Sequence, residues 1–129
     1  MSPSDTVSLL PTSSSTSSPT PRVSKTPVPT STPVAHTYTA TFTAQGISPS
    51  QLNIKVGDTV KFINQDSAAH WPASDPHPTH TICPGFDALR GLAKGESYSF
   101  KFTVAKTCPF HDHLNAFNKL FSGTIIISN

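Results

Sequence analysis

The chain has few charged residues and no long apolar run. Only 12% of its 129 residues are charged, and nine basic residues are interspersed with seven acidic ones. Nucleic-acid surfaces and polybasic membrane patches need clustered lysines and arginines, so this composition argues against both. No apolar stretch approaches the roughly 18 residues that a membrane-spanning helix requires. The sequence also shows no internal repeat and no amphipathic helix pattern, which leaves strands as the expected regular structure.

The first 34 residues lack the side chains that form a core. Serine, threonine and proline make up 24 of these 34 residues, and the only apolar cluster is Val7, Leu9 and Leu10. Such a segment cannot bury enough apolar surface to offset the entropy lost on ordering, so we expect residues 1–34 to form a disordered linker. A linker of this kind holds a domain away from a membrane or wall, and 34 flexible residues reach on the order of 30 Å.

A secretory signal is also missing from the N-terminus. No basic start is followed by an apolar run and a small-residue cleavage site. The linker still leads us to expect an extracytoplasmic protein, whether periplasmic, cell-surface or secreted. We expect a signal or membrane anchor, absent from this sequence, to tether the protein through the linker. A cytosolic protein with a flexible N-terminus is the alternative.

Residues 35–129 form the expected folded domain, because the aromatic residues of the chain concentrate there. About 95 residues suffice for one domain with a single core. Apolar and polar residues alternate over 38–42, 52–56, 60–64, 98–104 and 107–113, which predicts strands, and Gly57-Asp58 predicts a hairpin turn. Residues 123–128, with three consecutive isoleucines, are expected to close the domain. Residues 65–95 show no period and predict a long loop region, which is usually functional in a small domain. We therefore predict an all-β fold, an antiparallel Greek-key β-sandwich of roughly seven strands.

Five of the six histidines fall into two short clusters. The first comprises His70, His77 and His80, and the second comprises His111 and His113. Successive side chains on a strand point to opposite faces, so the His-Asp-His sequence at 111–113 aims both imidazoles to one side. Imidazole nitrogens bind copper and zinc, so the two clusters predict a metal site. A lone histidine, such as His36 at the edge of the linker, is more often an ordinary exposed residue.

The alternation of side chains along the 107–113 strand also indicates the direction in which Cys108 points. Cys108, Phe110 and Asp112 share one face of the 107–113 strand, opposite to His111 and His113. Because Phe110 belongs in the core, Cys108 points inward, and a disulfide with Cys83 is the favoured interpretation for an exported chain. Three alternatives stay open: two buried free thiols, a thiolate ligand at Cys108 if Pro109 breaks the strand, and a zinc site built from His77, His80, Cys83, Cys108 and His111.

Three segments of the domain carry a resemblance to a known family: residues 54–66 (IKVGDTVKFINQD), residues 92–100 (LAKGESYSF) and residues 123–127 (GTIII). They resemble the first long hairpin, the turn into the penultimate strands and the last strand of a cupredoxin, the family of plastocyanin and azurin. The resemblance covers residues 36–129. His70 falls where the first histidine ligand follows that hairpin. The resemblance implies a cupredoxin-like sandwich that binds copper.

The ligand loop departs from the blue-copper pattern of a cysteine, then a histidine, then usually a methionine. The cysteine position falls on Asp112, and the only methionine is Met1. Residues 70–80 (HWPASDPHPTH) together with 111–115 (HDHLN) resemble a histidine-rich branch of cupredoxins. The His-x-His pair is also similar to the copper-binding histidines of multicopper oxidases. This branch implies copper as the cofactor but does not specify an activity.

We therefore predict one Cu(II) ion held by histidines. His70, His111 and His113 are the expected necessary ligands, His80 completes the set, and His77 is either a fourth ligand or a residue behind the ligands. Asp112 is expected to orient a ligand imidazole through its second nitrogen, and Trp71 to pack over the site and limit the access of water. Imidazole-only ligation suits Cu(II) and favours copper over zinc.

Three kinds of function fit this sequence. The favoured one is an extracytoplasmic cupredoxin that binds or relays copper or transfers electrons, together with a redox or copper-delivery protein partner. A copper-dependent redox enzyme acting on oxygen species or nitrogen oxides is the alternative. It is less favoured because Asp112 is the only obvious general acid and the sequence indicates no substrate pocket. An adhesive or structural sandwich with incidental histidines is the third.

Overall fold

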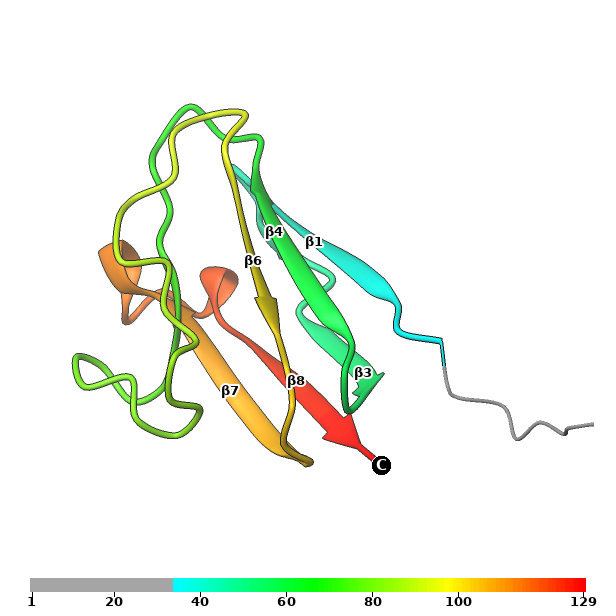
Figure 1. The fold of residues 1–129 in the computed structure, drawn as a ribbon. Helices are drawn as coiled ribbons and strands as arrows, with labels where there is room; N and C mark the ends of the chain where they lie inside the picture. Colours follow the sequence, from blue (N-terminus) through cyan, green and yellow to red (C-terminus); the bar gives the residue numbers. More distant parts are fainter. Residues whose placement is uncertain (1–33) are drawn as a thin grey trace, which may run out of the picture. The chain divides into compact units, whose positions relative to one another are not determined.

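Two four-stranded β-sheets pack together in this protein (Figure 1), whose residues 34–129 are described by a computed structural model. The first sheet has the order β2-β1-β4-β6, with strands β2 (Gly46–Ser48), β1 (Thr37–Thr43), β4 (Thr59–Asn64) and β6 (Ser97–Lys101). The second has the order β3-β8-β7-β5, with strands β3 (Gln51–Lys55), β8 (Gly123–Ser128), β7 (Lys106–Asp112) and β5 (Pro72–Ser74). Two 3₁₀ helices, η3 (His113–Asn115) and η4 (Lys119–Phe121), connect β7 to β8. Apart from Val34, the predicted linker lies outside the described residues.

The all-β sandwich is confirmed, but the sheets are mixed and not purely antiparallel. Strand β1 pairs in parallel with β4, and β3 pairs in parallel with β8, while the remaining pairs are antiparallel. The predicted hairpin at Gly57, whose φ is +96°, is not formed either. This turn does not close a hairpin, because β3 and β4 belong to different sheets. Alternation along a strand predicts which side chains point inward, but it does not specify the neighbouring strand.

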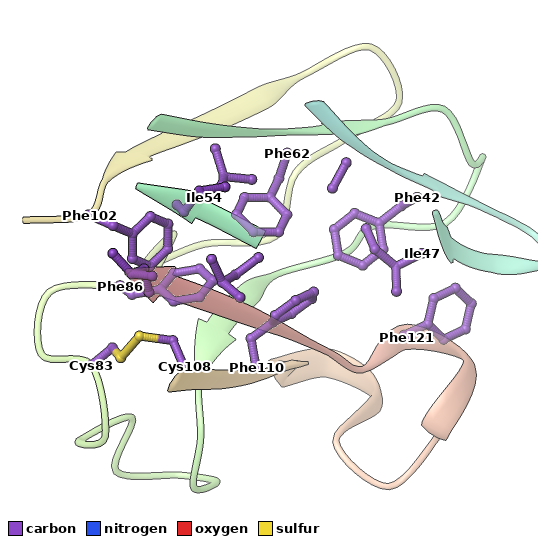
Figure 2. Close-up of a cluster of buried hydrophobic side chains, with 14 residues drawn as sticks. Phe42, Ile47, Ile54, Phe62, Cys83, Phe86, Phe102, Cys108, Phe110 and Phe121 are labelled. Carbon is purple, nitrogen blue, oxygen red and sulfur yellow. A yellow bond between two sulfur atoms is a disulfide. The ribbon is translucent and has the colours of Figure 1, made fainter. Parts of the chain in front are cut away.

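The core lies between the inner faces of the two sheets and is rich in phenylalanine (Figure 2). The ring of Phe62 from β4 lies 5.4 Å from the ring of Phe86 and 5.4 Å from that of Phe110. Phe62 and Phe86 are fully buried, and Phe110 is 1% exposed. Burying a phenylalanine side chain contributes roughly 1.5–3 kcal/mol. The core therefore holds β4 and β7 in a fixed relation, which positions the end of β7.

The loop region predicted at 65–95 is largely irregular, with one short strand that the sequence did not reveal. Strand β5 starts with a proline and has only three residues, so its signal was weak. Proline is tolerated here because β5 lies at the edge of its sheet. Its pairing with β7 places Ala73 opposite His111 and so brings the histidine-rich loop beside the end of β7. Among residues 34–129, no helix is long and apolar enough to cross a membrane.

Candidate metal centre

Four histidines converge at one end of β7. His77, His80, His111 and His113 each present a ring nitrogen, and these four nitrogens lie within 4.8 Å of one another. His77 Nδ1 lies 3.3 Å from His111 Nε2, and His80 Nε2 lies 3.1 Å from His113 Nδ1. Two nitrogen ligands of a tetrahedral ion stand about 3.3 Å apart when the metal–nitrogen bonds are about 2.0 Å. The spacing of these two pairs therefore fits ligands of one metal ion.

Local structure explains how each pair is held. His111 is the penultimate residue of β7, and His113 is the first residue of η3. The Asp112 side chain caps that helix by accepting a hydrogen bond from the Leu114 N–H group. His77 and His80 stand on the loop that follows β5. His80 adopts a φ of 56°, a left-handed conformation that is uncommon for a residue other than glycine. Such a conformation persists where the surroundings hold it, which is common at functional sites.

Two carboxylates orient one histidine of each pair. His111 Nδ1 lies 2.7 Å from Asp75 Oδ1, and His80 Nδ1 lies 2.8 Å from Asp87 Oδ2. A carboxylate that accepts from Nδ1–H fixes the tautomer, so the lone pair of Nε2 faces the cluster. The sequence analysis missed both residues and assigned this role to Asp112. The only signal was that two of the seven acidic residues fall close to His77 and His80.

The surroundings of His113 favour its neutral form. Burial lowers the pKa of His113 from its ordinary value, and the neighbouring His77, His80 and His111 lower it further. Burial raises the pKa of Asp87, but hydrogen bonds from Trp71 and His80 outweigh that effect and hold this pKa below its usual value. Metal ions bind neutral imidazole, so a depressed histidine pKa beside an ionised carboxylate suits a metal ligand.

His70 departs from the prediction. Its ring is 1% exposed, with Nδ1 lying 2.5 Å from Asp112 Oδ2 and Nε2 lying 2.8 Å from Asp66 Oδ2. It also stacks on Phe42 at a centroid distance of 4.8 Å. Since both ring nitrogens already contact carboxylates, neither is free to bind a metal, and we no longer count His70 as a ligand. Asp112 likewise differs from the prediction, because the imidazole that it orients is that of His70.

The other predicted residues take the following places. The Trp71 ring lies 4.3 Å from the His113 ring, and its Nε1–H group donates to Asp87 at 2.6 Å, so Trp71 covers the cluster.

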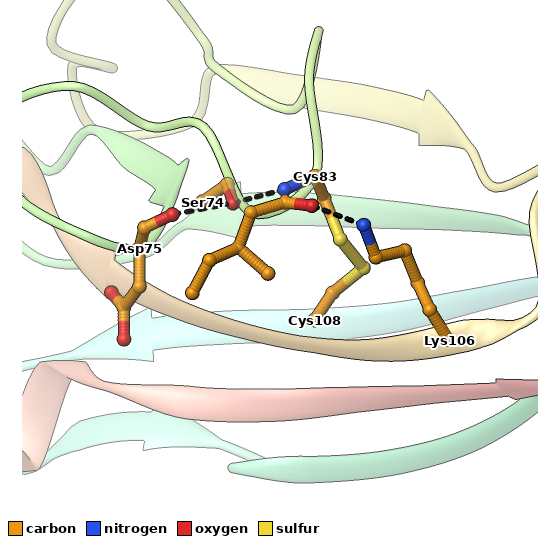
Figure 3. Close-up of a disulfide and its surroundings, with 6 residues drawn as sticks. Ser74, Asp75, Cys83, Lys106 and Cys108 are labelled. Carbon is orange, nitrogen blue, oxygen red and sulfur yellow. Dashed lines mark hydrogen bonds between the residues drawn. A yellow bond between two sulfur atoms is a disulfide. The ribbon is translucent and has the colours of Figure 1, made fainter.

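Cys83 and Cys108 form a disulfide with a Cα–Cα distance of 5.9 Å (Figure 3). The disulfide leaves no thiolate to bind a metal, which removes the open alternatives that require free sulfur. His36 lies outside the cluster, with a side chain that is 63% exposed.

Comparison with known proteins gave matches to solved structures only. No family model and no curated protein matches the chain. The Cu(I) form of an amicyanin mutant superposes with a TM-score of 0.57 at 26% identity, over 70% of this chain and 80% of that one. A reduced amicyanin mutant gives 0.57 at 25% identity, over 69% and 79%. A purple cupredoxin from Nitrosopumilus maritimus gives 0.60 at 21% identity, over 70% and 99%.

The topology, the histidine site and these similarities together define a cupredoxin domain. Within that class, the four-histidine cluster fits a histidine-rich variant. The amicyanin mutant of this comparison holds Cu(I). The four imidazoles found here are a donor set that suits copper without a thiolate or thioether ligand.

Proposed function

We propose that this protein is an extracytoplasmic copper-binding cupredoxin that holds one copper ion through His77, His80, His111 and His113. The convergence of four ring nitrogens within 4.8 Å supports the proposal most directly. The carboxylates behind His80 and His111 add to it, because they resemble the outer-shell partners of metal-bound histidines. Copper is favoured over zinc because, among the divalent first-row metals, Cu²⁺ binds a given nitrogen site more tightly than Zn²⁺ does.

Copper binding or relay fits this donor set better than fast electron transfer does. Blue-copper electron-transfer sites rely on a cysteine thiolate, and both cysteines here form a disulfide. A site of imidazoles alone also reorganises more when Cu(II) is reduced to Cu(I). His77 is the exposed member of the cluster, so a redox or copper-delivery protein would approach the metal from its side. The disulfide supports an oxidising, extracytoplasmic location.

A cavity beside His111 supports the second candidate, a copper-dependent redox enzyme acting on oxygen species or nitrogen oxides. Asp75, His111 and Lys119 help to line this cavity, whose volume is about 290 Å³. The Lys119 ammonium group would attract a small anion such as superoxide or nitrite. Turnover of superoxide or nitrite by the copper-loaded protein, at rates well above those of free copper, would support the enzyme. Binding without turnover supports the carrier.

Titration of the metal-free protein with Cu(II) tests the copper site itself. We expect one equivalent to bind, with nitrogen hyperfine structure in the paramagnetic resonance spectrum and no strong thiolate band near about 600 nm. Alanine at His80 or His111 should weaken binding steeply, whereas His36→Ala should leave it unchanged. An intense blue colour that Cys108→Ser abolishes would overturn the assignment and indicate an ordinary blue-copper site.

A further inference from the structure

The Cys83–Cys108 disulfide joins the two halves of the histidine cluster. Cys83 follows His80 by three residues, and Cys108 precedes His111 by three, although 25 positions separate the two cysteines. The bond therefore links the loop that carries His77 and His80 to the strand that carries His111. Figure 3 shows this link together with the hydrogen bonds around it.

The loop half of the cluster buries little apolar surface. Of residues 75–83, Cys83 is the only apolar residue that is buried, and residues 76–79 are all exposed. The His80 side chain is 8% exposed and contacts Asp87, while the N–H group of Asp75 donates to the carbonyl oxygen of Pro109 at the start of the loop. The Cys83 N–H group donates to Ser74 Oγ at 2.8 Å, and the Lys106 ammonium group donates to the carbonyl oxygen of Ile82. A segment with so few buried apolar contacts opens at low free-energy cost once its anchor is lost.

The strand half is held independently of the disulfide. Strand β7 pairs with β8 on one side and with β5 on the other. Phe110, between Cys108 and His111, is 1% exposed in the core (Figure 2). Breaking the disulfide would therefore leave His111 and His113 in place and loosen the segment that carries His77 and His80, whose remaining side-chain anchor is the His80–Asp87 contact. Two ligands at the ordered end of β7 and two on a loosened loop no longer form a preorganised site.

The disulfide lies in the wall of a surface cavity. The cavity has a volume of about 100 Å³, and its lining includes both cysteines, Phe100, Val104 and Lys106. Cys83 is 5% exposed and Cys108 is 1% exposed, so Cys83 is the less buried of the two cysteines. Lys106 also lines the cavity, and its positive charge would stabilise a thiolate that forms there.

We propose that this cavity is a thiol-exchange site, where a dithiol reduces the disulfide and thereby lowers the affinity of the histidine cluster for metal. This inference rests on the proposed function. A thiolate of the dithiol attacks the Cys83 sulfur, the bond between the two sulfurs breaks, and Cys108 leaves as a thiolate that takes up a proton. The second thiol of the reagent then attacks the mixed disulfide and releases Cys83 as a thiol. The protein gains two electrons and two protons, and the dithiol is oxidised to an intramolecular disulfide.

Reduction of the native metal-free protein by dithiothreitol tests the first half of this proposal. We expect both thiols to appear without denaturant, as counted by alkylation and mass spectrometry. Val104→Trp, which partly fills the cavity, should slow the reaction severalfold and leave Cu(II) affinity unchanged. A disulfide that resists dithiothreitol until the protein is unfolded would overturn the proposal.

The second half is tested with Cys83→Ser/Cys108→Ser, measured as Cu(II) affinity against a competing chelator. We expect binding at least tenfold weaker than that of the oxidised protein, with a native circular dichroism spectrum. Val60→Ala, which weakens the core away from the cluster, serves as the control and should keep its affinity. Equal affinity in the folded double variant would overturn this inference alone, whereas failure of the oxidised protein to bind copper would overturn the proposed function.

A second measurement applies if the double variant does not fold. The reduced and alkylated wild-type protein, freed of reagent, is treated with a nonspecific protease. We expect the first cuts within residues 76–82, while β7 stays protected. Cuts spread along the whole domain would show that the disulfide supports the fold in general and would overturn a specific effect on the cluster.

Discussion

At the scale of single residues, two histidine environments separate a binding role from a structural one. His80 and His111 each have one nitrogen on a carboxylate and the other facing a neighbouring histidine. His70 has carboxylates on both nitrogens and aromatic rings on its faces, with Phe121 at 4.6 Å and Phe42 at 4.8 Å. The number of free ring nitrogens distinguishes the two roles.

Asp87→Asn tests the orientation of His80. The amide loses the charge that favours Nδ1–H on the imidazole, so His80 Nε2 faces the metal less strictly. We expect Cu(II) affinity to fall by about 10-fold or more, as is usual for such partners. Competition titration measures the effect. Asp66→Asn, on the His70 side, is the matched control, and an equal loss of affinity in both variants would contradict the division between the two environments.

His70→Ala tests the structural role of His70. The substitution leaves the fully buried Asp112 side chain and the Asp66 carboxylate without their imidazole partner. We expect the free energy of unfolding to fall by about 3 kcal/mol, because the buried Asp112 side chain loses the hydrogen-bond partner that offsets its burial. Urea denaturation measures the loss. One equivalent of Cu(II) should still bind to the folded variant, and loss of that equivalent would restore His70 as a ligand.

At the scale of elements, the turn between β3 and β4 connects the two sheets. Asp58 ends this turn, with Oδ1 accepting from the His36 N–H at 2.8 Å and Oδ2 from the Lys55 N–H at 2.9 Å. Through these bonds, one carboxylate links the entry to β1 with the end of β3. A turn that connects two sheets needs such a link, since it gains no ladder hydrogen bonds of its own.

The acid stability of the domain should depend on Asp58. Hydrogen bonds from the backbone at His36 and Lys55 lower the pKa of this carboxyl from its ordinary value. A lowered folded-state pKa gives stability that is present above the unfolded value of about 3.9 and is lost as pH falls through the folded value. We expect Asp58→Asn to be less stable than the wild type at pH 7, with the difference shrinking below about pH 4. Thermal unfolding between pH 7 and about pH 3 measures the stability of both proteins. A stability difference that does not change with pH would contradict this role of Asp58.

At the scale of the whole molecule, the described residues 34–129 contain both the core and the metal cluster. We therefore expect a protein that lacks residues 1–33 to keep the thermal midpoint and the copper stoichiometry of the full chain. The composition of that segment gives no reason for it to add to the core. Calorimetry and metal analysis of the two proteins check this expectation. A large loss of either property would show that the segment packs on the domain.

Much of the fold was predictable because it depends on local periodicity. Alternation indicated the inward side of most strands, although Val104 at the end of the predicted 98–104 strand is 61% exposed and β6 ends at Lys101. The inward position of Cys108 predicted the disulfide that the structure contains. Parallel pairing of β1 with β4 was not predictable, since the inward faces would have been the same in an antiparallel sheet. Strand β5 escaped notice because three residues beginning with proline carry almost no periodic signal.

Alternation, composition and residue type are local properties, and they were enough to indicate a small β-sandwich with a disulfide and a histidine-rich end. Which histidines meet depends on the tertiary structure. His70 was nominated from its place in a family pattern, yet Asp112, which stands at the cysteine position of that pattern, holds it through a buried hydrogen bond. His77 lies on an exposed loop without any period, and the β5–β7 pairing brings that loop to His111. Contacts between residues far apart in the chain depend on how the strands pair and pack, and this long-range information is not contained in any short stretch of sequence.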